Sequence, residues 1–296
     1  MRPTPVVLDS EGCPLAATIR IPDGSPPFPS IVFTGPLSSV RDQAVDVYAE
    51  PLAERGFLTL TFDHRNFGTS GGLPRQHEDP AGKLVDLRTA VTALRDRQDV
   101  DPARIALCGV SLGAGYALRA ATIDPRVAAV VAVAGAFNSP LRMMQLLGPG
   151  PYRELLLKLL ATAHHTNGEP AYMPVVSADH GPAMVAGDEQ YSYYMTGPGR
   201  SQHWVNRITT ASAYQLITFD TLSAAELIAP TPVLVVHGRK DDYCSPELAR
   251  TVFDRVAGPK QLVWLDTDCH VDLYTRPPLV ADAVDAIASF LAGDRG

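Results

Sequence analysis

Short apolar runs alternate with segments of helical periodicity along most of the chain. Runs typical of buried strands occur at 31–34, 58–63, 105–108, 127–133, 231–236 and 261–265. Helical patterns occur at 42–55, 83–97, 114–121, 246–256 and 278–291. Strands that alternate with helices predict an α/β fold, in which a mostly parallel sheet carries helices on both faces. Since such sheets place their active sites at the carboxyl ends of the strands, the loops after these runs are the first places to look for chemistry.

Two parts of the chain depart from this rhythm. At the start, β-rich runs at 6–9 and 15–21 flank a Gly/Pro turn and predict an antiparallel hairpin. From 139 to 212 the chain is rich in Gly, Pro, Met, His and Tyr, and only 152–163 has a clear amphipathic helical pattern. We interpret 1–296 as one domain with a cap inserted at 139–212, because the leucines and tyrosines of that segment favour packing onto the sheet domain.

Composition restricts the partners of the protein. With 46% hydrophobic and 19% charged residues, the chain is typical of a globular protein, and its net charge of −7 disfavours nucleic acid and anionic membranes. The longest apolar run, 127–137, is too short to span a bilayer. We therefore expect a small-molecule substrate, with no nucleic-acid or membrane partner. Whether the chain forms a homodimer stays open.

The cysteines and the first residues bear on localisation. Cys13, Cys108, Cys244 and Cys269 are scattered, without a CxxC pair or a metal-binding spacing. The sequence begins without a signal-peptide core. Both features predict a cytoplasmic protein with reduced thiols and no metal site.

The strongest chemical signal is Gly109-Val110-Ser111-Leu112-Gly113, which lies between the apolar run 105–108 and the small-residue helical stretch 114–121. This is the Gly-x-Ser-x-Gly motif in a strand–turn–helix context. A serine hydroxyl is a poor nucleophile unless it is exposed, lies beside a base and has donors nearby for the developing oxyanion. A sharp strand-to-helix turn provides the exposure, and the flanking glycines permit the crowded backbone. Ser111 is therefore the predicted nucleophile.

An acid and a base follow Ser111 in the order Ser, Asp, His that this type of site requires. The strand at 233–236 leads into a loop that contains Asp241 and Asp242, and the strand at 261–265 leads into a loop that contains His270. We predict Asp241 as the orienting acid, with Asp242 as the alternative, and His270 as the base.

The other histidines have simpler interpretations. His64 is expected to anchor its loop by hydrogen bonds, and His237, at a strand end, to pack or hydrogen-bond locally. The adjacent His164 and His165 lack the spacing of a metalloprotease HExxH motif.

Two backbone amides are candidates for the oxyanion hole. One is that of Leu112, directly after the nucleophile, and the other comes from the loop 34–39 after an early strand. Because Pro36 has no N–H group, the second predicted donor is Leu37.

These residues resemble the α/β-hydrolase superfamily, most closely its dienelactone-hydrolase-like and esterase-like branch. The resemblance covers nearly the whole chain and rests on 63–72, 74–76, 78–80, the motif around Ser111 and the stretch 270–274. It implies an eight-stranded core with a helical cap, a Ser111–Asp241–His270 triad and no cofactor. Many relatives have His-Gly in the oxyanion loop, whereas this chain has Gly35-Pro36, a departure that bears on substrate and reaction type.

The 139–212 segment supplies the candidate substrate-binding residues, namely Met143, Met144, Tyr193, Tyr194 and Trp204. Methionines and aromatics above such a site favour a mainly apolar pocket. The leading hypothesis is a serine hydrolase that cleaves a carboxylic ester or thioester of a small-to-medium, largely apolar metabolite through an acyl-enzyme. Two alternatives remain open: a biosynthetic enzyme that catalyses acyl transfer, elimination or C–C cleavage, and a ligand-binding protein with vestigial catalysis.

Overall fold

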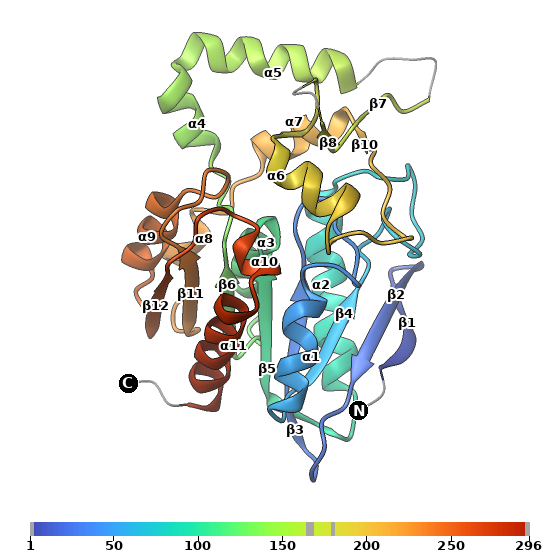
Figure 1. Cartoon of the computed structure of the whole chain (residues 1–296), viewed down its shortest axis with the longest axis vertical. Helices are drawn as coiled ribbons and strands as arrows, with labels where there is room; N and C mark the ends of the chain where they lie inside the picture. Colours follow the sequence, from blue (N-terminus) through green and yellow to red (C-terminus); the bar gives the residue numbers. More distant parts are fainter. Residues whose placement is uncertain (1–2, 164–168, 179–180, 294–296) are drawn as a thin grey trace.

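An eight-stranded sheet forms the centre of the computed structural model, which describes residues 3–163, 169–178 and 181–293 (Figure 1). Its strand order is β1-β2-β4-β3-β5-β6-β11-β12. The strands span Thr4–Ser10 (β1), Cys13–Arg20 (β2), Phe28–Thr34 (β3), Leu58–Phe62 (β4), Val100–Val110 (β5), Ala129–Val133 (β6), Val233–Gly238 (β11) and Lys260–Leu265 (β12). The predicted hairpin is confirmed as β1 and β2, and the strands from β4 to β12 run parallel.

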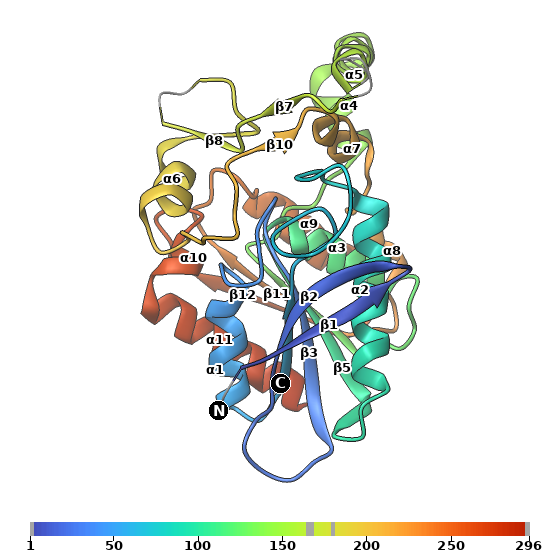
Figure 2. The same ribbon diagram turned by 90° about the vertical axis from the view of Figure 1, so that its right-hand side faces the viewer.

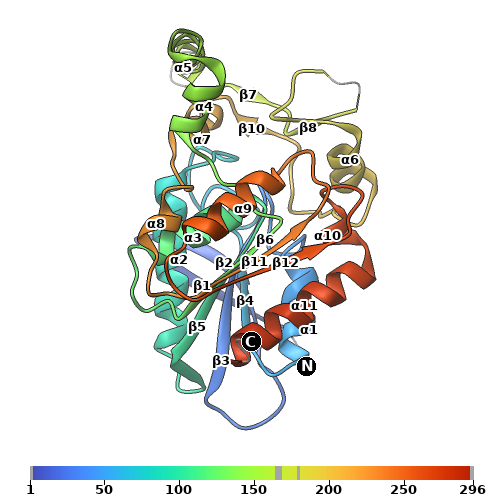
Figure 3. The ribbon, with the colours of Figure 1, turned by 90° about the vertical axis from the view of Figure 1, so that its left-hand side faces the viewer.

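Helices cover both faces of the sheet, as predicted. One face packs against α1 (Asp46–Glu54) and α11 (Pro277–Ala292), and the other against α2 (Pro80–Arg95), α3 (Leu112–Ala121), α8 (Ala224–Leu227) and α9 (Pro246–Arg255) (Figures 2 and 3). The central strands are therefore enclosed on both sides, and every residue of β4, β6 and β11 is buried. This burial explains their continuous apolar runs, since a half-exposed strand would alternate between apolar and polar residues.

The 139–212 segment belongs to the connection between β6 and β11, two strands that are neighbours in the sheet. It contains α4 (Pro140–Leu147), α5 (Pro149–Ala163), α6 (Asp188–Tyr191) and a π-helical turn (Ser192–Thr196), and α7 (Ala211–Thr218) follows. Two small sheets pair β7 (Tyr172–Met173) with β10 (Ile208–Thr209), and β8 (Val176–Ser177) with β9 (Val185–Ala186). Figures 1 to 3 all show these elements at one end of the sheet domain, above α3 and α10 (Asp272–Thr275).

The predicted helix at 152–163 lies within α5. His164 and His165 fall outside the described residues. Among the helices that the structure describes, none is both long enough and apolar enough to cross a bilayer.

Candidate active site

Ser111 occupies the turn between β5 and α3, and its backbone has the unusual angles φ 54° and ψ −120°. Such a positive φ is uncommon for a residue with a side chain, and strained residues of this kind gather at functional sites. The two motif glycines allow the turn to close. A side-chain carbon at Gly109 would overlap the Gly113 carbonyl oxygen, and one at Gly113 would overlap the Thr34 carbonyl oxygen. The predicted strand–turn–helix context of Ser111 is confirmed.

The two amides predicted for the oxyanion hole come from elements beside this turn. Leu112 is the first residue of α3, where backbone N–H groups have no partner inside the helix. Leu37, after the end of β3, lines the same cavity as Ser111 and Leu112. Pro36, the second residue of the Gly35-Pro36 departure from the family pattern, also lines this cavity.

A cavity of about 520 Å³ opens above Ser111, and His270 also lines it. Its remaining walls are mainly apolar. The 139–212 segment and α7 contribute, among others, Met143, Leu155, Leu159, Met184, Leu216 and Ile217. Gln190 is an exception, because its side chain is buried in this wall and neither its amide nitrogen nor its carbonyl oxygen has a hydrogen-bond partner. A buried carboxamide without partners is costly, so Gln190 is available to a polar group of a ligand.

Three of the five predicted substrate-binding residues line this cavity, namely Met143, Tyr193 and Tyr194. Met144 and Trp204 do not belong to its lining. Trp204 instead stacks on Tyr194, with ring centroids 4.6 Å apart, and its indole N–H donates to Ser38 Oγ at 3.1 Å. Trp204 therefore packs against Tyr194, a residue of the cavity wall, and does not itself face the cavity.

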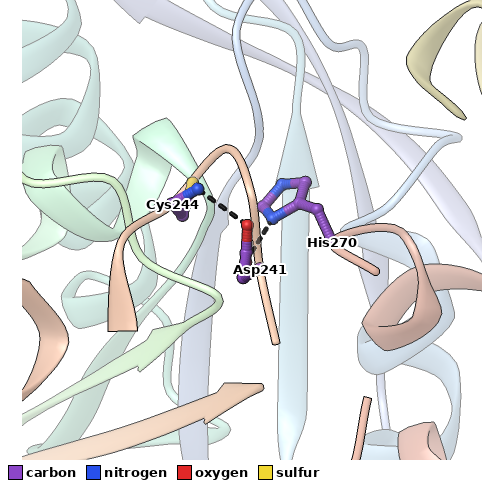
Figure 4. Close-up of side chains that lie close together, drawn as sticks. All are labelled: Asp241, Cys244 and His270. Atoms are coloured by element: carbon purple, nitrogen blue, oxygen red, sulfur yellow. Dashed lines mark hydrogen bonds and ion pairs between the residues drawn. The ribbon is translucent and has the colours of Figure 1, made fainter. Parts of the chain in front are cut away.

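Asp241 and His270 form a close pair where the loops after β11 and β12 meet (Figure 4). His270 Nδ1 lies 2.6 Å from Asp241 Oδ2, and Asp241 Oδ1 accepts the backbone N–H groups of Tyr243 at 2.9 Å and Cys244 at 2.7 Å. Asp242, the alternative acid, is exposed. The structure thus places Asp241 rather than Asp242 against the histidine.

The surroundings of His270 favour the charged form of its imidazole. Burial by itself lowers the pKa of His270, but the Cys244 side chain and the hydrogen bond with Asp241 outweigh burial and raise this pKa to about 10. Burial likewise opposes the charge of Asp241, and the hydrogen bond with His270 reverses that effect and lowers the carboxyl pKa below its usual value. Each partner therefore stabilises the charge of the other.

Two side chains that were not predicted from the sequence lie beside Ser111 and His270. The Tyr274 hydroxyl lies 2.5 Å from His270 Nε2 and lines the same cavity as Ser111. Cys244 Sγ lies 3.7 Å from Ser111 Oγ and within 4.8 Å of a His270 ring nitrogen. The resemblance at 270–274 includes Tyr274, but a family resemblance assigns no role to a residue outside the expected triad.

The structure confirms the predictions for His64 and His237, because both imidazoles form hydrogen bonds close to their own loops or strands. His64 Nε2 lies 2.9 Å from Thr34 Oγ1, and its Nδ1 lies 3.2 Å from Asp86 Oδ2. His237 is buried in β11, with Nδ1 3.0 Å from the Gly238 carbonyl oxygen. The His64 ring therefore links β3 to α2, whereas that of His237 bonds within its own strand.

Asp241, Cys244 and His270 are the group of described side chains best placed to hold a metal ion, with oxygen, sulfur and nitrogen atoms within 4.8 Å of one another (Figure 4). Two of these residues, however, are already joined by the 2.6 Å hydrogen bond between Asp241 and His270. Zinc ligands bind at about 2.0 to 2.3 Å from the metal, so tetrahedral coordination requires wider spacing between neighbouring ligand atoms. The cluster fits a hydrogen-bonded acid–base pair better than a preformed metal site.

Cys269, next to His270, is a weak candidate for a nucleophile. Burial and the neighbouring carboxylates Glu189 and Asp272 raise the pKa of its thiol to about 12. Since the thiolate is the reactive form, the Cys269 thiol is held in its unreactive state.

Residues 42–273 match the family described as serine aminopeptidase, S33. The chain belongs to this family of α/β hydrolases. The match confirms the resemblance to the α/β-hydrolase superfamily. The eight-stranded, mostly parallel sheet is the fold that the resemblance implies.

Several relatives align with most of this α/β hydrolase. An uncharacterized protein of Pseudomonas aeruginosa is 30% identical over 94% of this chain and 77% of its own, and its crystal structure superposes with a TM-score of 0.86. Thiohydrolase aneE of Aspergillus aculeatus is 28% identical over 82% of this chain and 78% of its own. Polyketide transferase grgF of a Penicillium species is 29% identical over 82% of this chain and 81% of its own, and its crystal structure superposes with a TM-score of 0.81.

Proposed function

We propose that this α/β hydrolase cleaves a carboxylic ester or thioester of a small-to-medium, largely apolar metabolite through an acyl-enzyme. The observation that carries the proposal is a single cavity lined by both Ser111 and His270, in which His270 is bound by Asp241. In this proposal Ser111 is the nucleophile, His270 the general base and Asp241 the group that orients and charges the imidazole.

The reaction proceeds in two halves. Ser111 Oγ attacks the carbonyl carbon while its proton moves toward His270, and the Leu37 and Leu112 amides bind the oxyanion. The tetrahedral intermediate then expels the alcohol or thiol, which receives the proton. Water repeats the sequence on the acyl-enzyme and releases the acid.

The cavity supports the substrate class. Its walls are mainly apolar side chains, which favour a hydrocarbon-rich acyl or leaving group, and Gln190 offers one donor and one acceptor to a polar group of the substrate. Thiohydrolase appears in the names of two relatives, one of them from Eupenicillium brefeldianum, and this supports a thioester as the scissile group.

Acyl transfer is the second candidate. Polyketide transferase appears in the names of relatives from a Penicillium species and Stachybotrys chlorohalonatus, both 29% identical. An apolar cavity covered by the 139–212 segment favours an organic acceptor over water, and the same acyl-enzyme serves both outcomes. These relatives also support a role in secondary metabolism.

Active-site labelling tests the attack by Ser111, the step that hydrolysis and acyl transfer share. A fluorophosphonate that gives a one-to-one adduct by intact mass on the wild type, and none on Ser111→Ala, is the expected result. If the folded wild-type protein remains unlabelled, the activated-serine proposal is wrong. Product analysis with acyl thioesters, with and without an added alcohol acceptor, then separates hydrolysis from transfer.

A further inference from the structure

Residues 186–190 of the 139–212 segment (segment 186–190) contact both loops that carry the proposed acid and base. They comprise the last residue of β9, Gly187 and the first three residues of α6. Figures 2 and 3 show α6 next to α10, the short helix that begins two residues after His270. Segment 186–190 therefore lies where it can hold the backbone of both loops.

The loop of His270 is held from two directions. Inside the loop, Asp272 Oδ2 accepts the backbone N–H groups of the two residues before His270, at 2.7 and 3.3 Å. The N–H group of Val271, directly after His270, instead donates to Glu189 Oε1 at 2.5 Å. A hydrogen bond to an ionised carboxylate is one of the stronger kinds in proteins. One side of His270 is thus fixed by its own loop and the other side by Glu189.

The loop of Asp241 is tied to the same segment through Tyr243. The Tyr243 backbone N–H donates to Asp241 Oδ1 at 2.9 Å, and its hydroxyl donates to the Ala186 carbonyl oxygen at 2.5 Å. A side-chain carbon at Gly187 would lie 1.8 Å from this hydroxyl, so a glycine there lets the contact form. Both members of the Asp241–His270 pair therefore lie within two residues of a hydrogen bond to segment 186–190.

The next residue of the segment faces the cavity. Gln190 lines it together with Ser111 and His270, and its carboxamide is buried without a hydrogen-bond partner. Adjacent residues of a helix point in different directions, so Glu189 can bind the loop of His270 while Gln190 points at a ligand. The residue that meets a ligand and the residue that holds the base are therefore neighbours in the chain.

The distance from His270 to Ser111 depends on the backbone that carries the imidazole. Asp241 binds one ring nitrogen and so sets the direction of the ring. The other ring nitrogen lies 2.5 Å from the Tyr274 hydroxyl, and Ser111 Oγ lies 3.7 Å from Cys244 Sγ. Since these contacts do not join the ring to Ser111, the anchors of the loop decide how closely the two approach.

We propose that Glu189 is a positioning residue for His270, which is placed for catalysis only while segment 186–190 lies against its loop. The inference rests on the proposed function. A general base must lie within hydrogen-bond reach of the proton that it takes. Without the Glu189 carboxylate, the Val271 N–H group turns to water and the backbone beside His270 is free to move. A ligand that hydrogen-bonds with Gln190 stabilises the same segment and, through Glu189, the position of the base.

The test measures how fast a fluorophosphonate labels Ser111 at increasing concentrations of the reagent. It compares the wild type with Glu189→Ala, Glu189→Gln and Glu247→Ala. Glu247→Ala is the matched control, because Glu247 in α9 links the same 139–212 segment to the sheet domain through Arg142 at 3.0 Å. It removes one such link without removing a hydrogen bond to the loop of His270.

Glu189→Ala is expected to lower the maximum labelling rate about tenfold or more, with little change in the half-saturating concentration, because a displacement of about 1 Å can cost about 100-fold in rate. Glu189→Gln keeps an oxygen acceptor and is expected to recover most of that loss. A wild-type maximum rate in Glu189→Ala, or an equal loss in Glu247→Ala, overturns the proposal. A wild type that does not label at all instead refutes the proposed function.

Hydrogen exchange on the wild type alone covers the case in which Glu189→Ala fails to fold. The exchange of the Val271 amide hydrogen is followed by NMR in D₂O. Its bond to Glu189 is expected to slow this exchange about tenfold or more relative to an unstructured chain. Exchange as fast as in an unstructured chain would show that Glu189 does not hold this loop, and overturns the proposal.

Discussion

The protein contains two buried histidine–aspartate pairs whose histidines have opposite acid–base behaviour. In the first, His64 lies 3.2 Å from Asp86, and burial lowers the pKa of the imidazole. In the second, His270 lies 2.6 Å from Asp241, and the pKa of the imidazole rises to about 10. A buried aspartate beside a histidine is thus not enough to charge it.

The two pairs differ in the groups around each carboxylate and around each imidazole. Asp86 Oδ1 accepts hydrogen bonds from Ser10 Oγ at 2.8 Å and from the Arg65 guanidinium at 2.9 and 2.8 Å. Its pKa is about 2 because His64 and Arg65 outweigh burial. Asp241 accepts two backbone N–H groups and His270. At His64, burial and the charge of Lys83 outweigh Asp86 and lower the imidazole pKa, whereas at His270 Cys244 and Asp241 together outweigh burial and raise it.

The largest expected contrast comes from replacing each aspartate by asparagine. Asp241→Asn is expected to lower kcat about 10⁴-fold, because the histidine loses its orientation and charge partner. Asp86→Asn is expected to lower the free energy of unfolding by about 3 kcal/mol, because it leaves the Arg65 guanidinium without its partner. Steady-state kinetics and urea unfolding of both variants measure the contrast. Equal activity losses in the two variants would contradict it.

The pH dependence of activity sharpens the comparison for His270. Attack requires a neutral imidazole, and the pKa of His270 is raised from 6.5 to about 10. The value of kcat/KM is therefore expected to rise with pH through the alkaline range, by about tenfold per unit below the pKa. A pH–rate profile on a hydrolysed ester measures it. A plateau that begins near pH 6.5 would show that Asp241 and Cys244 do not charge the histidine.

The pH dependence of stability sharpens the comparison for His64. Its folded pKa is lowered from 6.5, so below that pH the unfolded chain binds a proton that the native state excludes. The contribution of His64 is expected to be constant above pH 6.5 and to fall below it, by up to about 1.4 kcal/mol per pH unit. Urea unfolding between pH 5 and pH 8 measures the slope. His64→Gln is the control, because other groups also titrate, and an identical slope in this variant would refute the assignment.

The smallest expected effect comes from Cys244→Ala. The Cys244 side chain raises the pKa of His270, so its removal is expected to move the acid limb of the kcat/KM profile toward lower pH. Comparison of the variant and wild-type profiles on the same ester measures the shift. An unchanged limb would assign the raised pKa to Asp241 alone.

The fold was largely predictable because each strand and helix carries its own pattern, but some boundaries depend on distant contacts. The predicted helix at 42–55 begins only at Asp46. Gln43 accepts the Val40 N–H at 2.9 Å and donates to the Gly199 carbonyl oxygen at 2.5 Å. A turn held partly by residue 199 cannot be read from the local periodicity.

The candidate site was predictable to a similar degree. Its proposed nucleophile, acid and base were predicted from loops after strands, since parallel strands bring their carboxyl ends to one edge. Tyr274 and Cys244 were missed, because a tyrosine in a short helix and a scattered cysteine carry no pattern of their own. Met144 and Trp204 were expected in the pocket, but the direction of a side chain in an irregular segment depends on its packing.

By itself, the sequence determined the order of strands and helices, the turn at Ser111 and the presence of an acid and a base after the later strands. These features depend on backbone stereochemistry and on apolar periodicity over short distances. Only the tertiary structure decided that Asp241 rather than Asp242 meets His270, that the pKa values of His270 and His64 shift in opposite directions, and that Tyr274 lies against His270 Nε2. Those outcomes depend on separations of a few ångströms between residues far apart in the chain, where burial and hydrogen bonding determine each proton's position.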